Sequence, residues 1–213
     1  SFPTISATGA NGSIIHYKPN RKSSVLKNGE LYLCDSGGQY YGGTTDITRT
    51  IFLGDNPPED LKLIYTKVLL GHLNISMLKF PAGTKGYQLD SIARYNLWND
   101  GLDYNHGTGH GVGSFLGVHE GPQSISKNPS NVSLEPGMII SNEPGFYKKG
   151  KFGIRIENLI FVKKTKNKLN FENLTLAPVD KDLIDYKLLN KEEKDYILKY
   201  HLMVYSKLSN FLN

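Results

Sequence analysis

Cysteine is nearly absent from this chain, and long hydrophobic runs are missing altogether. Cys34 is the only cysteine among 213 residues, so an internal disulfide and a zinc site built from several thiolates are both excluded. Any metal must therefore be bound by oxygen and nitrogen ligands. A single thiol fits a reducing compartment, and the expected location is cytoplasmic. No apolar run reaches the roughly 18 residues that a membrane-spanning helix needs, so no membrane association is expected.

Charge of one sign is not in large excess either. The chain has 25 Lys and Arg against 20 Asp and Glu, and the surplus consists of scattered lysines, which predicts a solvated basic surface and no nucleic-acid partner. The hydrophobic share of 38% suffices for a globular domain with a sizeable core, which excludes a disordered chain. The first residues, SFPTISATG, contain no basic leader and no initiator methionine, and we interpret them as an internal starting point.

The hydrophobic pattern predicts strands and helices within one α+β domain. Apolar residues predict a hairpin with a wide turn from residues 30–35 and 47–53. Two further strands are predicted at 137–143 and 151–162, and a short early strand at 13–17. Apolar stripes at helical spacing predict three helices, which begin near Pro58, near Leu89 and at Lys191.

Three ring side chains in these helical stripes are expected to be structural. His72, Trp98 and His201 each lie among apolar residues at helical spacing, which is typical of packed core positions. The last helix also has a start signal, because Asn190 is followed three residues later by Glu193, the spacing of a capping box.

Four carboxylates and one histidine stand at predicted strand ends or in glycine-rich turns: Asp35, Asp46, His110, Glu143 and Glu157. Taken singly, each carboxylate has a plain explanation as a turn residue or a solvated strand residue. Glu157 is the hardest to explain in this way, since the run after it is apolar enough for a buried strand. A buried carboxylate must be paired or bound to a cation.

The charges of these five residues favour a site for two divalent cations. Four carboxylates carry four negative charges, two divalent ions would balance them, and the imidazole adds a neutral ligand. In two-metal sites the ions clamp the attacking and leaving atoms and lower the pKa of bound water. A ligand set of oxygen with one nitrogen and no sulfur suits Mn, with Co or Zn as substitutes.

The glycine-rich segment 105–122 invites two other interpretations. Its GTGHGVG run lacks the GxxxxGK[ST] pattern of a phosphate-binding loop, which argues against a nucleotide site. His106 and His110 are four residues apart, as in HExxH zinc proteases, but that pattern needs a helix and a glutamate after the first histidine, where glycine stands here.

Several stretches together resemble the Xaa-Pro aminopeptidases (aminopeptidase P) of the pita-bread metallopeptidases. They are DSGGQYYGGTTDITRT at 35–50, HGTGHGVGSFLGVHEGP at 106–122, EPGFY at 143–147 and GIRIEN at 153–158. The resemblance extends over nearly the whole chain, and the eukaryotic cytosolic branch is most similar. It implies a curved antiparallel sheet flanked by helices, with two metal ions on its concave face.

The resemblance also implies a role for each of the five ligands. By analogy with the family, Asp35 would bind one ion, and His110 with Glu143 would bind the other. Asp46 and Glu157 would bridge the two ions.

Five further residues fall on family positions around the site. His119 would hydrogen-bond the scissile carbonyl oxygen, and His16 and His106 would line the subsite that receives proline. Arg155 would belong to a network that moves protons, and Tyr147 would lie beside the site.

The activity implied is release of the N-terminal residue from peptides with proline in the second position. An Xaa-Pro dipeptidase or methionine aminopeptidase of the same fold is an alternative, and so is a catalytically dead pita-bread binding module. Relatives carry an upstream part before the SFPTIS segment. We therefore expect residues 1–213 to be a C-terminal catalytic metallopeptidase domain, incomplete on its N-terminal side, that another polypeptide segment completes and that forms a homodimer.

Overall fold

The computed structural model describes residues 2–115 and 117–212, and Ser1, Leu116 and Asn213 lie outside the description. The described residues form a mixed α and β structure, as predicted. Its α-helices are α1 (Glu59–Ser76), α2 (Tyr87–Trp98) and α3 (Lys191–Leu208). Its longer strands are β1 (Ile5–Thr8), β2 (Leu31–Ser36), β5 (Ile47–Phe52), β9 (Ile139–Asn142), β10 (Gly145–Lys148), β11 (Phe152–Arg155), β12 (Asn158–Thr165) and β13 (Lys168–Asn173). Two-residue strands are β3 (Gln39–Tyr40), β4 (Gly43–Thr44), β6 (Lys79–Phe80), β7 (Gly109–His110) and β8 (Ser124–Ile125), and two 3-10 turns are η1 (Gly9–Ser13) and η2 (Tyr186–Leu188).

The first sheet has the strand order β1-β2-β5, with neighbouring strands antiparallel. The predicted hairpin is confirmed, since β2 pairs with β5 in a register that places Asp35 opposite Thr48. The predicted wide turn between β2 and β5 contains the small hairpin of β3 and β4. Strand β2 alternates between buried and half-buried residues, as a sheet with one face on the core requires.

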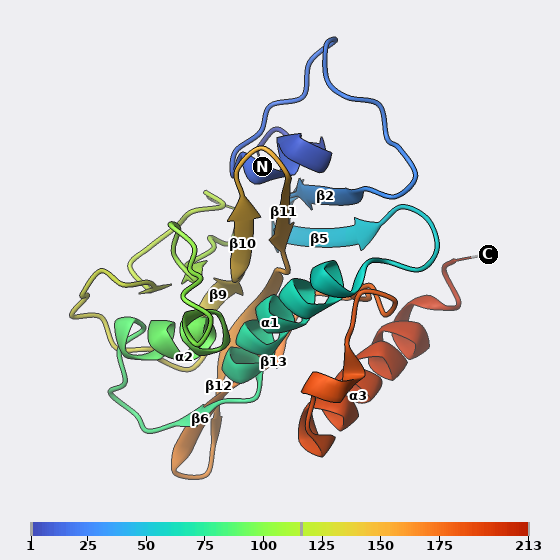
Figure 1. The fold of residues 1–213 in the computed structure, drawn as a ribbon. Helices are drawn as coiled ribbons and strands as arrows, with labels where there is room; N and C mark the ends of the chain where they lie inside the picture. Colours follow the sequence, from blue (N-terminus) through green and yellow to red (C-terminus); the bar gives the residue numbers. More distant parts are fainter. Residues whose placement is uncertain (1, 116, 213) are drawn as a thin grey trace.

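A second antiparallel sheet has the order β6-β13-β12-β9, and the β10–β11 hairpin lies between it and the first sheet (Figure 1). The register of β9 and β12 places Asn142 opposite Asn158. Consequently the residues just beyond these positions, Glu143 and Glu157, lie at the same end of the strand pair.

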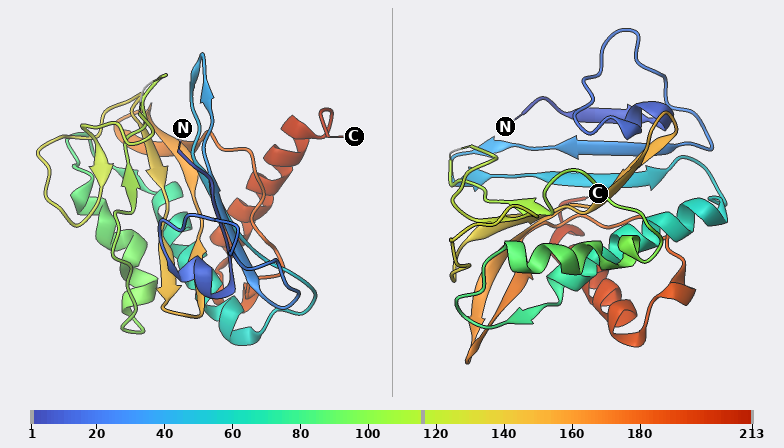
Figure 2. Two further views of the ribbon diagram at one scale, coloured as in Figure 1. Left: turned by 90° about the horizontal axis from the view of Figure 1, so that it is seen from above. Right: turned by 60° about the vertical axis from the view of Figure 1, so that its left-hand side comes forward.

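The helices cover one side of these strands. Helix α1 crosses over β11, β12 and β13, while α2 and α3 lie at either side of it (Figures 1 and 2). Gly71 allows α1 and α2 to pack closely, because a Cβ there would overlap the carbonyl oxygen of Ala93. Side chains of α1, including Val68, Leu69 and Ile75, are buried in the two clusters that form the core.

Two strand predictions need correction. Residues 13–17 are not a strand, because η1 ends at Ser13 and turns follow; the strand in this region is β1, which pairs with β2. The span 151–162 is divided at Ile156 and Glu157 into β11 and β12, which belong to different sheets. The alternating apolar residues up to Ile156 are followed after only two polar residues by the apolar run 159–162, so the sequence pattern alone did not reveal the break. Strands β10 and β13 were not anticipated.

The prediction that Trp98 is a core residue is wrong. Trp98 is 44% exposed, since it is the last residue of α2 and its neighbour Leu97 takes the buried position. The amino group of Lys127 lies 6.0 Å from its ring centroid.

The two histidines of the helical stripes are structural, as predicted. His72 is buried, its Nδ1 lies 3.0 Å from the carbonyl oxygen of Asn142, and burial followed by the charge of Arg49 lowers its pKa to about 3. His201 accepts a hydrogen bond from the Val179 backbone N–H through Nε2. The capping box of Asn190 and Glu193 is confirmed at the start of α3. Within the described part of the chain, every helix is too short or too polar to cross a bilayer.

Candidate metal centre and active site

The structure brings the predicted site residues together around one cavity of about 390 Å³. Its lining includes every predicted site residue except Tyr147: His16, Asp35, Asp46, His106, His110, His119, Glu143, Arg155 and Glu157. Tyr147 lies directly behind this lining, because its hydroxyl contacts His106 and Arg155. Phe2, Pro3, Ile5 and Ile15 form an apolar part of the wall that the sequence analysis did not identify.

Sheet register explains why the candidate ligands meet. Asp35 lies in β2 and Asp46 immediately precedes β5, so antiparallel pairing of these strands brings both carboxylates to one end of the first sheet. Glu143 and Glu157 lie together beyond β9 and β12. His110 is in β7, and the bridge from Gly111 to Ile140 holds that strand against β9.

The ligand atoms are close enough to share a cation. One ligand atom from each of Asp46, His110 and Glu157 lies within 4.8 Å of the other two. His110 Nε2 is 3.4 Å from Asp46 Oδ2 and 3.2 Å from Glu143 Oε1.

Three buried carboxylate oxygens have no hydrogen-bond partner among the described residues: Asp35 Oδ1, Asp46 Oδ1 and Glu157 Oε1. A buried charged oxygen without a partner is costly, and buried polar groups in proteins are almost always satisfied. These three acceptors around one cavity fit divalent cations, and the donor set of oxygen and imidazole nitrogen suits such ions.

Burial and mutual repulsion raise the pKa of two carboxyls in the metal-free protein. Glu157 is only 1% exposed, and its pKa is raised well above the usual value by burial and then by the charges of Glu143, Asp46 and Asp35. Burial raises the pKa of Asp35 to about 6 even though Arg155 acts in the opposite direction. The site therefore contains more negative charge than the protein alone can neutralise.

The imidazole of His110 supplies part of the missing positive charge. Burial acts to lower its pKa, but the contacts with Asp46 and Glu143 raise it to about 11. Burial likewise acts to raise the pKa of Glu143, while His110 lowers it to about 2. A cation that binds here must displace the His110 proton, because a ligating imidazole is neutral.

Arg155 connects the candidate ligands to Tyr147. This buried guanidinium donates from Nη2 to Asp35 Oδ2 at 2.6 Å, from Nη1 to the Tyr147 hydroxyl at 2.6 Å and from Nε to Thr48 Oγ1 at 3.0 Å. Because Arg155 binds Oδ2 of Asp35, the other oxygen, Oδ1, remains available to a ligand in the cavity that Asp35 lines.

The hydrogen bonds of His106 define its tautomer. Nδ1 lies 2.8 Å from the carbonyl oxygen of Gly107, so Nδ1–H donates. Nε2 lies 2.9 Å from the Tyr147 hydroxyl and accepts from it, because burial raises the pKa of Tyr147 to about 12 and keeps the phenol protonated. Burial lowers the pKa of His106, which favours the neutral imidazole.

The other two histidines are exposed at the cavity mouth. The His119 ring stands edge-on to His110 with 4.2 Å between the ring centroids, and burial together with the charge of His110 lowers its pKa. His16 lies in the turn that follows η1 and also lines the cavity.

Two hydroxyl residues that were not predicted from the sequence support the candidate ligands. Thr48 Oγ1 donates to Glu157 Oε2 at 2.6 Å. Ser141 Oγ donates to Glu143 Oε1 at 3.0 Å and accepts the His110 backbone N–H at 2.9 Å. Alternation in β5 was a signal for Thr48 alone, which is buried on the same face as Thr50; Ser141 directly follows the core residue Ile140 and so faces the other side of β9.

Gly109 sets how closely β7 approaches β9, so we expect Gly109→Ala to damage the site. A Cβ at this position would overlap the carbonyl oxygen of Ser141, and relieving that overlap must move His110. Overpacking of this kind costs about 1–3 kcal/mol of stability. Thermal unfolding and metal-binding calorimetry would measure the two effects. Gly42→Ala is the matched control, since a Cβ there meets no described atom within 4 Å; equal behaviour of the two variants would contradict the prediction.

Comparison with known families matches both parts of the chain. The family described as "Metallopeptidase family M24" matches residues 1–164, and the "C-terminal region of peptidase_M24" matches residues 167–213. Two fungal relatives are both named "Probable Xaa-Pro aminopeptidase P". The one from Laccaria bicolor is 50% identical over 100% of this chain and 35% of its own length, and the one from Fusarium vanettenii is 52% identical over 99% and 36%. The chain thus spans about a third of these relatives' length.

Solved structures agree with this similarity. The X-prolyl aminopeptidase of Caenorhabditis elegans, described as a cytosolic enzyme with a di-nuclear active site, superposes with a TM-score of 0.95 at 42% identity and covers 99% of this chain and 35% of its own. A dipeptidase from Pyrococcus horikoshii has a TM-score of 0.74 at 32% identity over 84% of this chain and 48% of its own.

Proposed function

Because this chain belongs to metallopeptidase family M24 and has its pita-bread fold, we propose that it hydrolyses the first bond of peptides whose second residue is proline. The observation that carries the proposal is the group of buried carboxylate oxygens without partners around the cavity. The names of the relatives support the proline preference.

Two divalent ions would be held by the five acidic and imidazole ligands. By analogy with the family, Asp35 would bind one ion, His110 and Glu143 would bind the other, and Asp46 and Glu157 would bind both. Manganese suits these ligands, with cobalt or zinc as substitutes. Such ions polarise a carbonyl group and lower the pKa of water that they bind.

The chain's own residues would orient the peptide. A bond before proline is a tertiary amide and offers no N–H, so the enzyme must recognise the carbonyl oxygen, the ring and the free N-terminal amine instead. The apolar wall of Phe2, Pro3, Ile5 and Ile15 suits an aliphatic part of the peptide. Because two divalent cations would balance the four carboxylates, the free N-terminal amine would be recognised as a nitrogen ligand at the metal centre.

Histidines would supply a hydrogen bond at the reacting bond and imidazole rings at the proline subsite. An imidazole N–H of His119 at the mouth would donate to the carbonyl oxygen, where negative charge develops during attack. His106 would contribute to the proline subsite in one fixed tautomer, because Gly107 and Tyr147 occupy its two nitrogens. His16, which lines the same cavity, would contribute to the same subsite.

Arg155 and Tyr147 would keep these groups in position and provide a route for protons. The guanidinium orients Asp35 and the phenol at once, and the phenol donates to His106. The proposal also includes a cytosolic location, a homodimer and a preceding polypeptide segment. The cytosolic description of the worm enzyme and the one-third coverage of the relatives support the first and last of these.

The test compares four peptides on protein with measured metal content. Ala-Pro-Ala with a free N-terminus is expected to release alanine, whereas N-acetyl-Ala-Pro-Ala and Ala-Ala-Ala are expected to resist, since one lacks the amine and the other the proline ring. Faster hydrolysis of the dipeptide Ala-Pro would make the protein a dipeptidase. Absence of cleavage in a protein that binds no divalent metal would overturn the proposal in favour of a binding module.

A further inference from the structure

Helix α2 contains an ion pair that is buried away from the cavity. Arg94 donates from Nε to Asp90 Oδ2 at 2.6 Å and from Nη2 to Asp90 Oδ1 at 3.2 Å, and the two side chains are only 1% and 3% exposed. A buried ion pair contributes little to stability, because desolvation of both charges offsets their attraction. Its presence therefore calls for another explanation.

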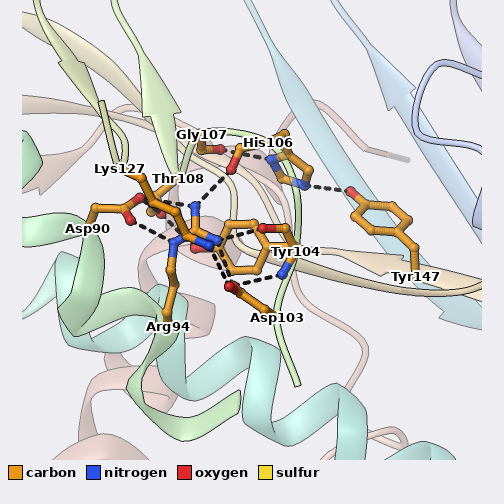
Figure 3. A network of polar contacts seen from close by, with 9 residues as sticks. All are labelled: Asp90, Arg94, Asp103, Tyr104, His106, Gly107, Thr108, Lys127 and Tyr147. Atoms are coloured by element: carbon orange, nitrogen blue, oxygen red, sulfur yellow. Dashed lines mark hydrogen bonds and ion pairs between the residues drawn. The ribbon is translucent and has the colours of Figure 1, made fainter. Parts of the chain in front are cut away.

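The remaining donors of Arg94 hold the backbone of the loop after α2. Nη1 donates to the carbonyl oxygen of Tyr104 at 2.7 Å, and Nη2 donates to the carbonyl oxygen of His106 at 2.8 Å. Nη1 also pairs with Asp103, and the guanidinium carbon lies 3.8 Å from the centroid of the Tyr104 ring. Figure 3 shows Arg94 directed into this loop from α2.

Asp90 holds the same loop two residues further on. Its Oδ1 accepts a hydrogen bond from Thr108 Oγ1 at 2.7 Å, and the Tyr104 hydroxyl lies 2.6 Å from the same Thr108 oxygen. The carbonyl oxygen of Thr108 in turn accepts the backbone N–H of Glu143 at 2.7 Å. One ion pair thus fixes the backbone on both sides of Gly107, a residue whose missing Cβ otherwise leaves the chain many conformations.

We propose that Arg94 and Asp90 are positioning residues for this site. Arg94 holds the His106 backbone so that the imidazole faces Tyr147, and Asp90 acts through Thr108 on the backbone of Glu143. The inference rests on the proposed function for the roles of His106 and Glu143. Neither Arg94 nor Asp90 lines the cavity, so both would act on it through the loop.

Arg94→Lys separates the contacts that Arg94 makes with the loop backbone from the contact that Asp90 makes with Thr108. All experiments use the full-length protein. The lysine side chain can still pair with Asp90, but one ammonium cannot reach the carbonyl oxygens of Tyr104 and His106 as the guanidinium fork does. We expect faster hydrogen exchange at residues 104–108 of the metal-free protein, with exchange in β12 and β13 unchanged. Lys67→Met is the control, because it removes an ion pair from α1 to Asp100, just after α2, and leaves the contacts of Arg94 and Asp90 with residues 104–108 in place.

Kinetics then test whether Arg94 acts through His106. We expect Arg94→Lys to lower kcat/KM by about 10–100-fold, the usual effect of removing a supporting partner. In a His106→Ala background the same substitution should cause almost no further loss, since residues that act through one another are not additive. The role of Arg94 would be overturned if Arg94→Lys lowered kcat/KM by the same factor in both backgrounds. Unchanged hydrogen exchange at residues 104–108 would overturn it as well.

Thr108→Val tests the contact of Asp90 with Thr108, and it still allows a test of the proposal if Arg94→Lys fails to fold. This variant keeps the shape and the backbone carbonyl but loses the donor to Asp90, so we expect weaker binding of Mn²⁺ in calorimetry and faster exchange of the Glu143 amide. Wild-type values for both would overturn the role of Asp90. If the wild-type protein cleaves no proline peptide, the proposed function fails, while exchange in the metal-free variants still decides whether α2 positions the loop.

Discussion

Glu157→Gln is expected to abolish peptide hydrolysis and yet make the metal-free protein more stable at neutral pH. The substitution removes one of the two proposed bridging ligands, and the ions supply several kcal/mol of transition-state stabilisation. At 1.36 kcal/mol per tenfold, turnover should fall by about 1,000-fold or more. Asp46→Asn should have the same effect on turnover, since it removes the other bridge.

The stabilising part of this prediction follows from the raised pKa of Glu157. Below its usual value of 4.5 the carboxyl is protonated in both the folded and the unfolded chain. As the pH rises past 4.5, the unfolded chain releases the proton while the folded chain retains it, so folding loses stability with rising pH. Glutamine does not titrate, and the free energy of unfolding of the variant should therefore exceed that of the wild type by a margin that grows with pH.

Thermal unfolding with and without Mn²⁺, over a series of pH values, measures both effects. Manganese should raise the unfolding temperature of the wild type far more than that of the variant. Glu172→Gln is the control, because this exposed glutamate pairs with Lys163 on the same sheet and lies outside the site. A Glu157→Gln protein that is less stable than the wild type without metal, or that retains wild-type turnover, would contradict the metal-site assignment.

Arg155→Met is expected to destabilise the protein by about 3–5 kcal/mol, the cost of leaving the partner of a buried ion pair without its counter-charge. Asp35 loses its only described ion-pair partner, and Thr48 and Tyr147 each lose a donor. Turnover should fall as well, because Asp35 and the phenol are no longer oriented. Denaturant unfolding and kcat measured on metal-loaded protein would show the two losses.

A second substitution identifies the cause. In the double variant Arg155→Met with Asp35→Asn the buried charge is also gone, so the loss of stability should be smaller than the sum of the two single losses. Arg21→Met replaces an exposed arginine and should change stability by no more than about 0.5 kcal/mol. Additive losses for Arg155 and Asp35 would show that the ion pair does not carry the effect.

Local sequence patterns predicted those features whose cause is local. The β2–β5 hairpin follows from alternation between two runs joined by glycine and threonine, and the start of α3 follows from the hydrogen bonds of Asn190 and Glu193. The prediction failed at Trp98, because helical periodicity does not show where the neighbouring elements stop covering a helix. It also failed at residues 13–17, where a short apolar run carries no information on the pairing partner.

The sequence by itself determined the kinds of ligand available, the burial expected of Glu157 and the family to which its motifs belong. Only the tertiary structure decided which oxygens face one cavity and which acceptors have no protein partner, and only it revealed that Arg94 and Asp90 hold the histidine loop. The physical reason is distance along the chain. Asp35 and Arg155 are 120 residues apart, and their contact depends on strand register and packing that no local pattern encodes.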